Sequence, residues 1–274
     1  MRDHYDLAEL SKKLATIDTD APVELDREKA ALSNFYTPKA YEMFKRLEFK
    51  NLLGRFEETN AEPEDAVFLR TVTDFSEAEE LFGTIAKEEK AGAALLTEET
   101  PKDGPMADRS RLLVGMAVAY GSGEPDVVYF PAEGFLTGDY LKEKLTELQK
   151  QIPLFCVMDG KEFLKDMPDA DEAHLFDAGI AAYLLNPLKS QYSYDDIVKE
   201  YVHRYVPAVE EIFGGSKIPA AGKMTPEQQE SYAGHQAYAV FAAQENMEKL
   251  LKEQGMWDLY RNCLLYTSDA ADEL

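Results

Sequence analysis

Histidine often binds metals or transfers protons in proteins, and it occurs four times in this chain of 274 residues. His4, His174, His203 and His235 are widely separated and form neither an HxxxH nor an HExxH motif. A zinc centre needs such side chains at a defined spacing, for example on one face of a helix. The pattern therefore predicts structural histidines and no histidine-based metal centre.

The glycine pairs, the acidic run and the aromatic residues provide no clearer signal of chemistry. GSGEP (121–125) and Gly214–Gly215 lack the Lys-Ser/Thr pair that completes a phosphate-binding loop, so we interpret both as turns. The acidic run 166–177 is typical of a solvated loop and a helix start. The single tryptophan and the tyrosines do not alternate with Arg or Lys as base-stacking residues do. Residue types and spacing alone define no active site.

Composition restricts the class of protein. Hydrophobic residues make up 45% of the chain, enough for a sizeable core, which excludes wholesale disorder. The 29 Lys and Arg residues face 52 Asp and Glu residues, so the net charge is −23. Such a surface repels phosphate and anionic lipid, which argues against a strong autonomous nucleic-acid binder or a membrane partner. Two cysteines build no disulfide framework, and an N-terminus as charged as MRDHYDLAEL predicts a cytoplasmic protein.

The first part of the chain, 1–56, is predicted to be helical. One helix is expected over 6–17 and a second over 38–56, with Thr37 as its N-cap. The acidic segment 57–66 carries no Lys or Arg and is predicted to be an extended linker at a domain boundary. The apolar face of the first helix is predicted to consist of Leu7, Leu10, Leu14 and Ile17.

Beyond residue 66, strand and helix patterns follow one another and favour a mixed sheet in an α/β or α+β domain. Ser76 and Glu79 have the spacing of a capping box, which would begin the first helix of this region. The predicted strands cover 67–72, 91–96, 111–120, 126–130 and 154–158, and the predicted helices cover 75–87, 139–151, 173–185, 194–205, 206–213 and 226–253.

Several segments resemble a known family. LSKKLATIDTDAPVELD (10–26), followed by LEFKNLLGRF (47–56), resembles the C-terminal part of the 5′-nuclease domain in the bacterial DNA polymerase I family. FDAGIAAYLLNP (176–187) and SYDDIVKEYV (193–202) resemble its 3′–5′ exonuclease-like domain. NMEKLLKEQGMWDLY (246–260) resembles the helix that leads into the polymerase domain. The matches occur in the family's order.

The resemblance implies a fragment with a ribonuclease-H-like α/β fold, a mixed sheet flanked by helices and preceded by a small helical segment. It assigns 1–56 to the 5′-nuclease domain, 57–66 to a linker, 67–254 to the exonuclease-like domain and 255–262 to the start of the connection to the polymerase domain. The parent enzyme would be a DNA-directed DNA polymerase that uses Mg²⁺ in DNA replication and repair. The metal-binding aspartates of the 5′-nuclease and the whole polymerase domain would lie outside this chain.

The family's exonuclease site needs several carboxylates around two divalent ions, and its first motif is an Asp-x-Glu at a strand end. In AGAALLTEET these two positions fall on Thr97 and Glu99, or on Leu96 and Glu98 after a shift of one residue. In either register the aspartate is missing.

The second and third motifs are also altered. Asn-x-x-x-Asp corresponds to Asp159 and Phe163, and Tyr-x-x-x-Asp corresponds to Tyr232 and Gln236. Thr, Phe and Gln cannot supply the negative charge that hard divalent cations require. We therefore predict no catalytic residue and no metal in this domain, only vestigial positions. The alternative is a site rebuilt from Glu98, Glu99, Asp159 and Asp177.

The last segment, 263–274, does not continue the resemblance. Its codons are compatible with a sequencing adapter read in frame, so we interpret it as an artefact of assembly and Cys263 as part of it. The alternative is an ordinary acidic tail.

The function expected from these observations is that of an inactive spacer domain within a DNA polymerase I. The fragment is expected to be a monomer with weak or no DNA binding, while DNA would be bound by the missing domains. The alternatives are an active metal-dependent 3′–5′ exonuclease and a free-standing interaction module.

Overall fold

The computed structural model describes residues 5–17, 40, 43–44, 67–99, 111–189 and 192–264. Contacts within the chain divide it into two units, 1–62 and 63–274, each described by itself. The division falls in the predicted linker 57–66, most of which lies outside the described residues, as does most of the predicted helix 38–56. The predicted segment 263–274 is described only at its first two residues. The domain boundaries drawn from the sequence stay predictions.

In the first unit, α1 (Tyr5–Ala15) confirms the predicted helix. Its apolar side chains share one face, and Leu14 is 78% exposed. Ile17 lies beyond the end of the helix. Throughout the described part of the chain, no helix combines the length and the apolar character that crossing a bilayer requires.

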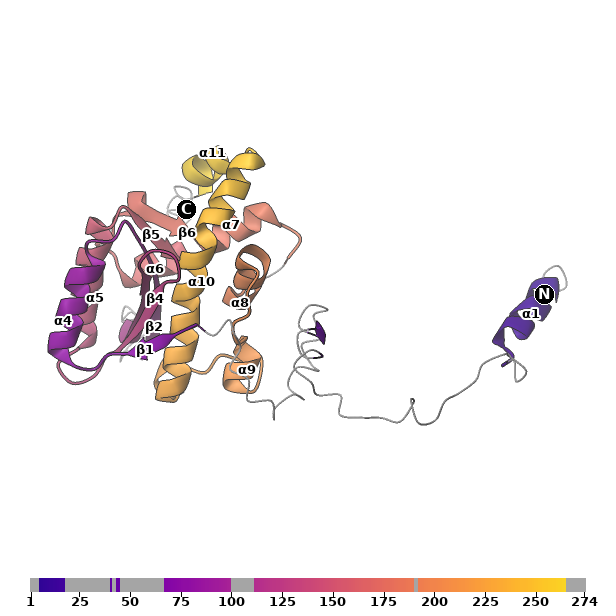
Figure 1. Ribbon diagram of the computed structural model, residues 1–274, viewed down its shortest axis with the longest axis horizontal. Coiled ribbons are helices and arrows are strands. Elements are labelled where there is room, and N and C mark those ends of the chain that lie inside the picture. Colours follow the sequence, from indigo (N-terminus) through magenta and orange to yellow (C-terminus); the bar gives the residue numbers. More distant parts are fainter. Residues whose placement is uncertain are drawn as a thin grey trace, which may run out of the picture. The chain divides into compact units, whose positions relative to one another are not determined.

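The second unit is built on a mixed sheet of six strands in the order β1-β4-β3-β2-β5-β6 (Figure 1). The central strands β2, β3 and β4 are antiparallel, while β1, β5 and β6 join the sheet in parallel pairings. The mixed sheet predicted from the sequence is confirmed. The strands are β1 (Leu69–Thr71), β2 (Lys90–Glu99), β3 (Arg111–Tyr120), β4 (Asp126–Pro131), β5 (Leu154–Val157) and β6 (Leu175–Asp177).

Helices cover both faces of the sheet, α4 and α5 on one face and α10 on the other (Figure 1). Short segments complete the unit: a 3₁₀ turn at Glu172–His174, a π turn at Val198–Val202, a 3₁₀ turn at Ala221–Lys223, α11 (Trp257–Leu259) and a π turn at Tyr260–Leu264. The helices are α4 (Phe75–Ile85), α5 (Gly138–Gln151), α6 (Gly160–Asp166), α7 (Ala178–Leu185), α8 (Tyr194–Ile197), α9 (Val209–Phe213) and α10 (Pro226–Glu253).

Two local predictions are wrong. The helix predicted over 173–185 begins only at Ala178, because Leu175–Asp177 pairs in parallel with β5 as a buried edge strand. The N-cap of α4 is Asp74 and not Ser76, since the Asp74 carboxylate accepts a hydrogen bond from the Glu77 N–H at 2.9 Å. The first of these predictions failed because β6 has only three residues, too few to show the two-residue alternation of a strand, so its pairing with β5 decides its structure.

The helices predicted over 194–205 and 206–213, which precede α10, are both shorter than predicted. The helix expected over 194–205 is α-helical only to Ile197 and continues as the π turn Val198–Val202, which His203 ends with a left-handed φ of 60°. The helix expected over 206–213 starts at Val209. In contrast, α10 has the predicted bounds, with Thr225 and Gln228 forming a capping box.

The close approach of α10 to β2 depends on a glycine. A Cβ at Gly92 would lie 2.6 Å from the Ala237 carbonyl oxygen and 2.9 Å from the Phe241 Cβ. The interface is otherwise formed largely by alanines, among them the buried Ala94 and Ala233. Small residues therefore let the helix backbone lie directly against the sheet.

We expect Gly92→Ala to lower the free energy of unfolding by about 1–3 kcal/mol, because the new methyl group has no space to occupy. Gly83→Ala is the matched control: Gly83 lies in α4 with nothing within 4 Å of an added Cβ, and should gain about 0.5–1 kcal/mol. Urea unfolding measures both. Equal effects of the two substitutions would contradict the close-packing argument.

Candidate functional site

The end of β2 sends alternate side chains to opposite faces of the sheet. Leu96 is buried in the core cluster beneath α10. The next residue, Thr97, points to the other face, where its hydroxyl donates to Asp166 Oδ2 at 3.3 Å. The Glu98 side chain points back to the α10 side. Its Oε2 lies 2.4 Å from the position that a Cβ at Gly222 would take, and Gly222 is in the 3₁₀ turn that precedes α10. Leu96 and Glu98, the positions of the shifted register, therefore face α10, whereas Thr97 faces the other side of the sheet.

The third-motif positions lie on α10, on the same side of the sheet as Leu96. The Tyr232 ring packs edge-on against Tyr194, with ring centroids 5.8 Å apart, and against Phe213 at 5.4 Å. Burial raises the pKa of Tyr232, and a side-chain hydrogen bond with Gln236 acts in the opposite direction. The tyrosine is therefore held in an aromatic cluster next to a neutral amide, where a metal-binding site would need a carboxylate.

The second-motif positions contribute to structure. The Phe163 ring is 5% exposed and packs against Phe155, with ring centroids 5.8 Å apart, on the α5 side of the sheet. Asp159 is the N-cap of α6, and its Oδ1 accepts the Glu162 N–H at 3.0 Å. The six predicted positions are therefore not gathered in one pocket: Thr97 and Phe163 lie on one side of the sheet, and Tyr232 on the other.

Two of the four carboxylates of the alternative, rebuilt site, Asp159 and Asp177, cap helices. Asp177 is 2% exposed, and its two oxygens accept N–H groups from Gly160 at 2.6 Å and from Ile180 at 2.8 Å. Within the described residues, no group of three or more His, Cys, Asp or Glu side chains is arranged to hold a metal ion.

Asp177 is an unusual carboxylate. Burial, with a smaller contribution from nearby Asp159, raises its pKa to about 6, although the backbone N–H groups of Ile180, Gly160 and Gly179 favour the charged form. The acidic run 166–177 includes a helix start, as predicted, since Asp177 is the N-cap of α7. The prediction that the run is solvated is wrong at both ends, because Asp166 and Asp177 are buried. Asp177 is buried because it ends β6 and caps α7.

Asp166 belongs to a charged cluster that the sequence did not reveal. Its Oδ1 lies 3.2 Å from Arg111 Nε, and the same guanidinium donates to Glu162 at 2.8 Å. Lys142 donates to the Arg111 carbonyl oxygen at 3.0 Å. Burial raises the pKa of Asp166, and Arg111 and Lys142 act against this shift. The spacing of Glu162 and Asp166, one helical turn apart on α6, was the only available signal.

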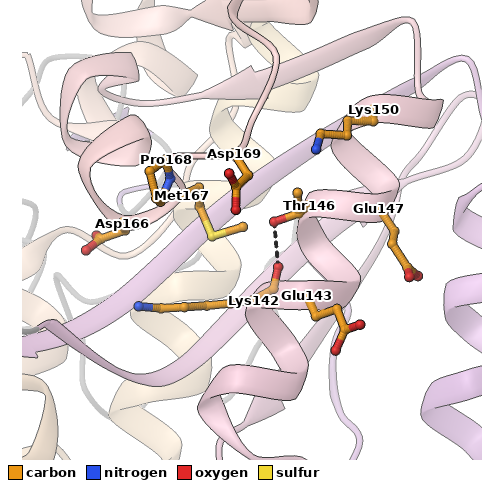
Figure 2. Close-up of a pocket in the computed structure, with 9 residues that line it drawn as sticks. All are labelled: Lys142, Glu143, Thr146, Glu147, Lys150, Asp166, Met167, Pro168 and Asp169. Carbon is orange, nitrogen blue, oxygen red and sulfur yellow. Dashed lines mark hydrogen bonds between the residues drawn. The ribbon is translucent and has the colours of Figure 1, made fainter.

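A pocket of about 350 Å³ adjoins this cluster, between α5 and the end of α6 (Figure 2). Lys142 and Lys150 line it together with Asp166 and Asp169. The Thr146 hydroxyl donates to the Lys142 carbonyl oxygen at 2.8 Å, the hydrogen bond dashed in Figure 2. Ammonium and carboxylate groups both face the pocket. Its charge therefore gives no preference for an anion such as a phosphate.

Comparisons with solved structures establish the class of fold. The catalytic core of RRP6 from Trypanosoma brucei superposes with a TM-score of 0.52 at 15% identity, over 82% of this chain and 59% of that chain. NrnC of Brucella melitensis, bound to pGG, gives a TM-score of 0.50 at 15% identity, over 76% and 94%. The fold is that of the ribonuclease-H-like 3′–5′ exonucleases, as predicted.

Comparison of sequences identifies the relatives. No family model matches the chain. It is 23% identical to DNA polymerase I of Bacillus subtilis (strain 168) over 268 residues, which are 95% of this chain and 28% of that protein. It is 29% identical to DNA polymerase I of Bacillus caldotenax over 192 residues, which are 68% of this chain and 20% of that protein. The resemblance to bacterial DNA polymerase I is confirmed, and the chain spans less than a third of each of these relatives.

One prediction from this site concerns the ion pair between Arg111 and the buried Asp166. Arg111→Met should lower the free energy of unfolding at neutral pH by about 3 kcal/mol, because it leaves the buried Asp166 carboxylate without its guanidinium. Adding Asp166→Asn to this variant should restore part of the loss. The control is Arg70→Met, since Arg70 and its partner Glu77 are 40% and 48% exposed and the pair should contribute no more than about 1 kcal/mol. Equal losses in the two single variants would contradict this assignment.

Another prediction concerns the effect of Asp177 on how the free energy of unfolding depends on pH. Its pKa is higher in the folded protein than in the unfolded chain, so its protonation stabilises the fold below about pH 4, and this contribution is lost as the pH rises through about 6. Relative to Asp177→Asn, the unmodified protein should lose about 3 kcal/mol between about pH 4 and pH 7. Urea unfolding across this range tests it, with the exposed Asp169→Asn as control. A pH-independent difference would refute the assignment.

Proposed function

We propose that this chain is part of a bacterial DNA polymerase I whose 3′–5′ exonuclease-like domain does not cleave DNA. The observation that carries the proposal is the fate of the motif positions. Leu96 is buried in an apolar cluster, Phe163 packs in the opposite core, and Gln236 supplies an amide where the site needs a carboxylate. A site without converging carboxylates cannot hold the two ions on which this chemistry depends.

The remaining acidic residues support the same proposal. Asp159 and Asp177 cap helices, and Asp166 pairs with Arg111. Each carboxylate that stabilises a helix end or an ion pair cannot also turn towards a metal ion without losing that contact. The fold is therefore stabilised by groups that could have served catalysis.

As a spacer, the domain would separate a 5′-nuclease domain from a polymerase domain that uses Mg²⁺ for template-directed synthesis. In this proposal DNA is bound by those other domains, and the fragment is a monomer that binds DNA weakly or not at all. The net charge of −23 supports weak binding, because a polyanion is repelled by a surface of the same sign.

The proposal is tested by incubating the purified chain with end-labelled single-stranded DNA and Mg²⁺ or Mn²⁺. We expect no shortening that depends on the divalent ion, since the site lacks the charge to hold the ions. An active 3′–5′ exonuclease serves as the positive control for substrate and buffer.

Two single variants make this experiment decisive. Glu98 is the carboxylate on the α10 face, and Glu99 is its neighbour at the end of β2. Metal-dependent shortening that Glu98→Ala abolishes and Glu99→Ala preserves would show an active nuclease and overturn the proposal. Shortening that survives in both variants would point to a contaminating nuclease, and purification to its loss would then support the proposal.

A further inference from the structure

The segment that follows α10 turns back onto the domain. Gly255 adopts a φ of +69°, a left-handed conformation that ends the helix, and the Met256 N–H donates to the Leu251 carbonyl oxygen at 2.8 Å. The short helix α11 and the π turn 260–264 follow directly. This is the segment that the sequence predicts to begin the connection to the next domain.

Tyr260 buries its whole side chain in this turn. Its exposed fraction is 0%, and its ring lies 5.4 Å from that of Phe176 in β6 and 5.4 Å from that of Trp257, on which it stacks. Lys252 of α10 covers the Trp257 ring, with Nζ 4.9 Å from the centroid. Two aromatic residues of the segment are thus packed between the end of α10 and the edge of the sheet.

The Tyr260 hydroxyl is fully engaged with one residue of the sheet. It accepts the Asp177 backbone N–H at 2.7 Å and donates to the Asp177 carbonyl oxygen at 3.3 Å. A buried hydroxyl needs such partners, so the ring cannot leave its site without exposing two polar groups of Asp177 as well as its own.

Asp177 in turn is bound to the starts of two helices. Its carboxylate accepts the first N–H of α6, from Gly160, and caps α7 through Ile180. One tyrosine hydroxyl therefore connects the segment after α10 to the point where β6, α6 and α7 meet.

We propose that Tyr260 is the anchor that fixes the direction in which the chain leaves the exonuclease-like domain. Residues up to 260 move as one body with the sheet, and any flexibility between this domain and a following one begins only beyond the anchor. This inference depends on the proposed spacer role for its purpose, because a fixed exit lets an inactive domain set the position of its neighbour. The anchor itself depends only on the contacts of Tyr260.

The test uses the full chain and two readouts at the anchor. In Tyr260→Phe the ring is kept and the hydroxyl removed, so the Asp177 amide loses its acceptor. Its hydrogen-exchange rate, resolved by NMR, should rise at least about fivefold, while the Gly160 and Ile180 amides stay protected by the Asp177 carboxylate. Trp257, the only tryptophan of the chain, should become more accessible to acrylamide quenching.

Tyr194→Phe is the matched control, because Tyr194 is also buried and its hydroxyl donates to the Pro207 carbonyl oxygen at 2.6 Å, away from the anchor. It should leave the exchange of the Asp177 amide and the quenching of Trp257 unchanged. Unchanged exchange and quenching in Tyr260→Phe would overturn the proposal, as would free local rotation of Trp257 in the unmodified chain, measured by fluorescence anisotropy. Neither readout measures nuclease activity, so a failure here is distinct from a failure of the proposed function.

Discussion

The contact between α10 and the centre of the sheet is the constraint on which the second unit depends. Gly92 has no side chain, and the alanines around it are small, so the helix backbone lies against β2. A long helix held this closely has a fixed rotation about its axis, because any turn would bring a larger side chain against the sheet. That rotation places Tyr232 and Gln236 on the side of Leu96, and it also fixes the end of the helix from which the Tyr260 segment departs.

The same arrangement sets the surroundings of the positions that the resemblance assigns to an exonuclease site. In a two-ion nuclease, mutual repulsion of closely placed carboxylates is balanced by the bound metal. Here Leu96 or Thr97, Phe163 and Gln236 stand where the family's motifs have aspartates, and two acidic residues nearby have partners within the fold. Arg111 pairs with Asp166, and helix N–H groups surround the Asp177 carboxylate.

The buried charges divide the domain into two regions with different tasks. On the α5 side, Arg111 joins the start of β3 to α6 through Asp166. At the sheet edge, Asp177 joins α6 and α7 and receives the Tyr260 hydroxyl. Both groups hold elements distant in sequence in a fixed arrangement, which suits a domain whose proposed task is to keep its neighbours apart.

The sequence by itself determined the class of fold and most elements of the second unit, because these depend on local patterns and residue types. The bounds of α10 followed from its cap and periodicity. The tertiary structure alone decided which side chains at the end of β2 face α10, since Leu96 and Thr97 point to opposite faces of the sheet. It also decided that Asp166 and Asp177 are buried and that Tyr260 reaches back to β6, because such contacts join residues far apart in the chain whose patterns carry no information about each other.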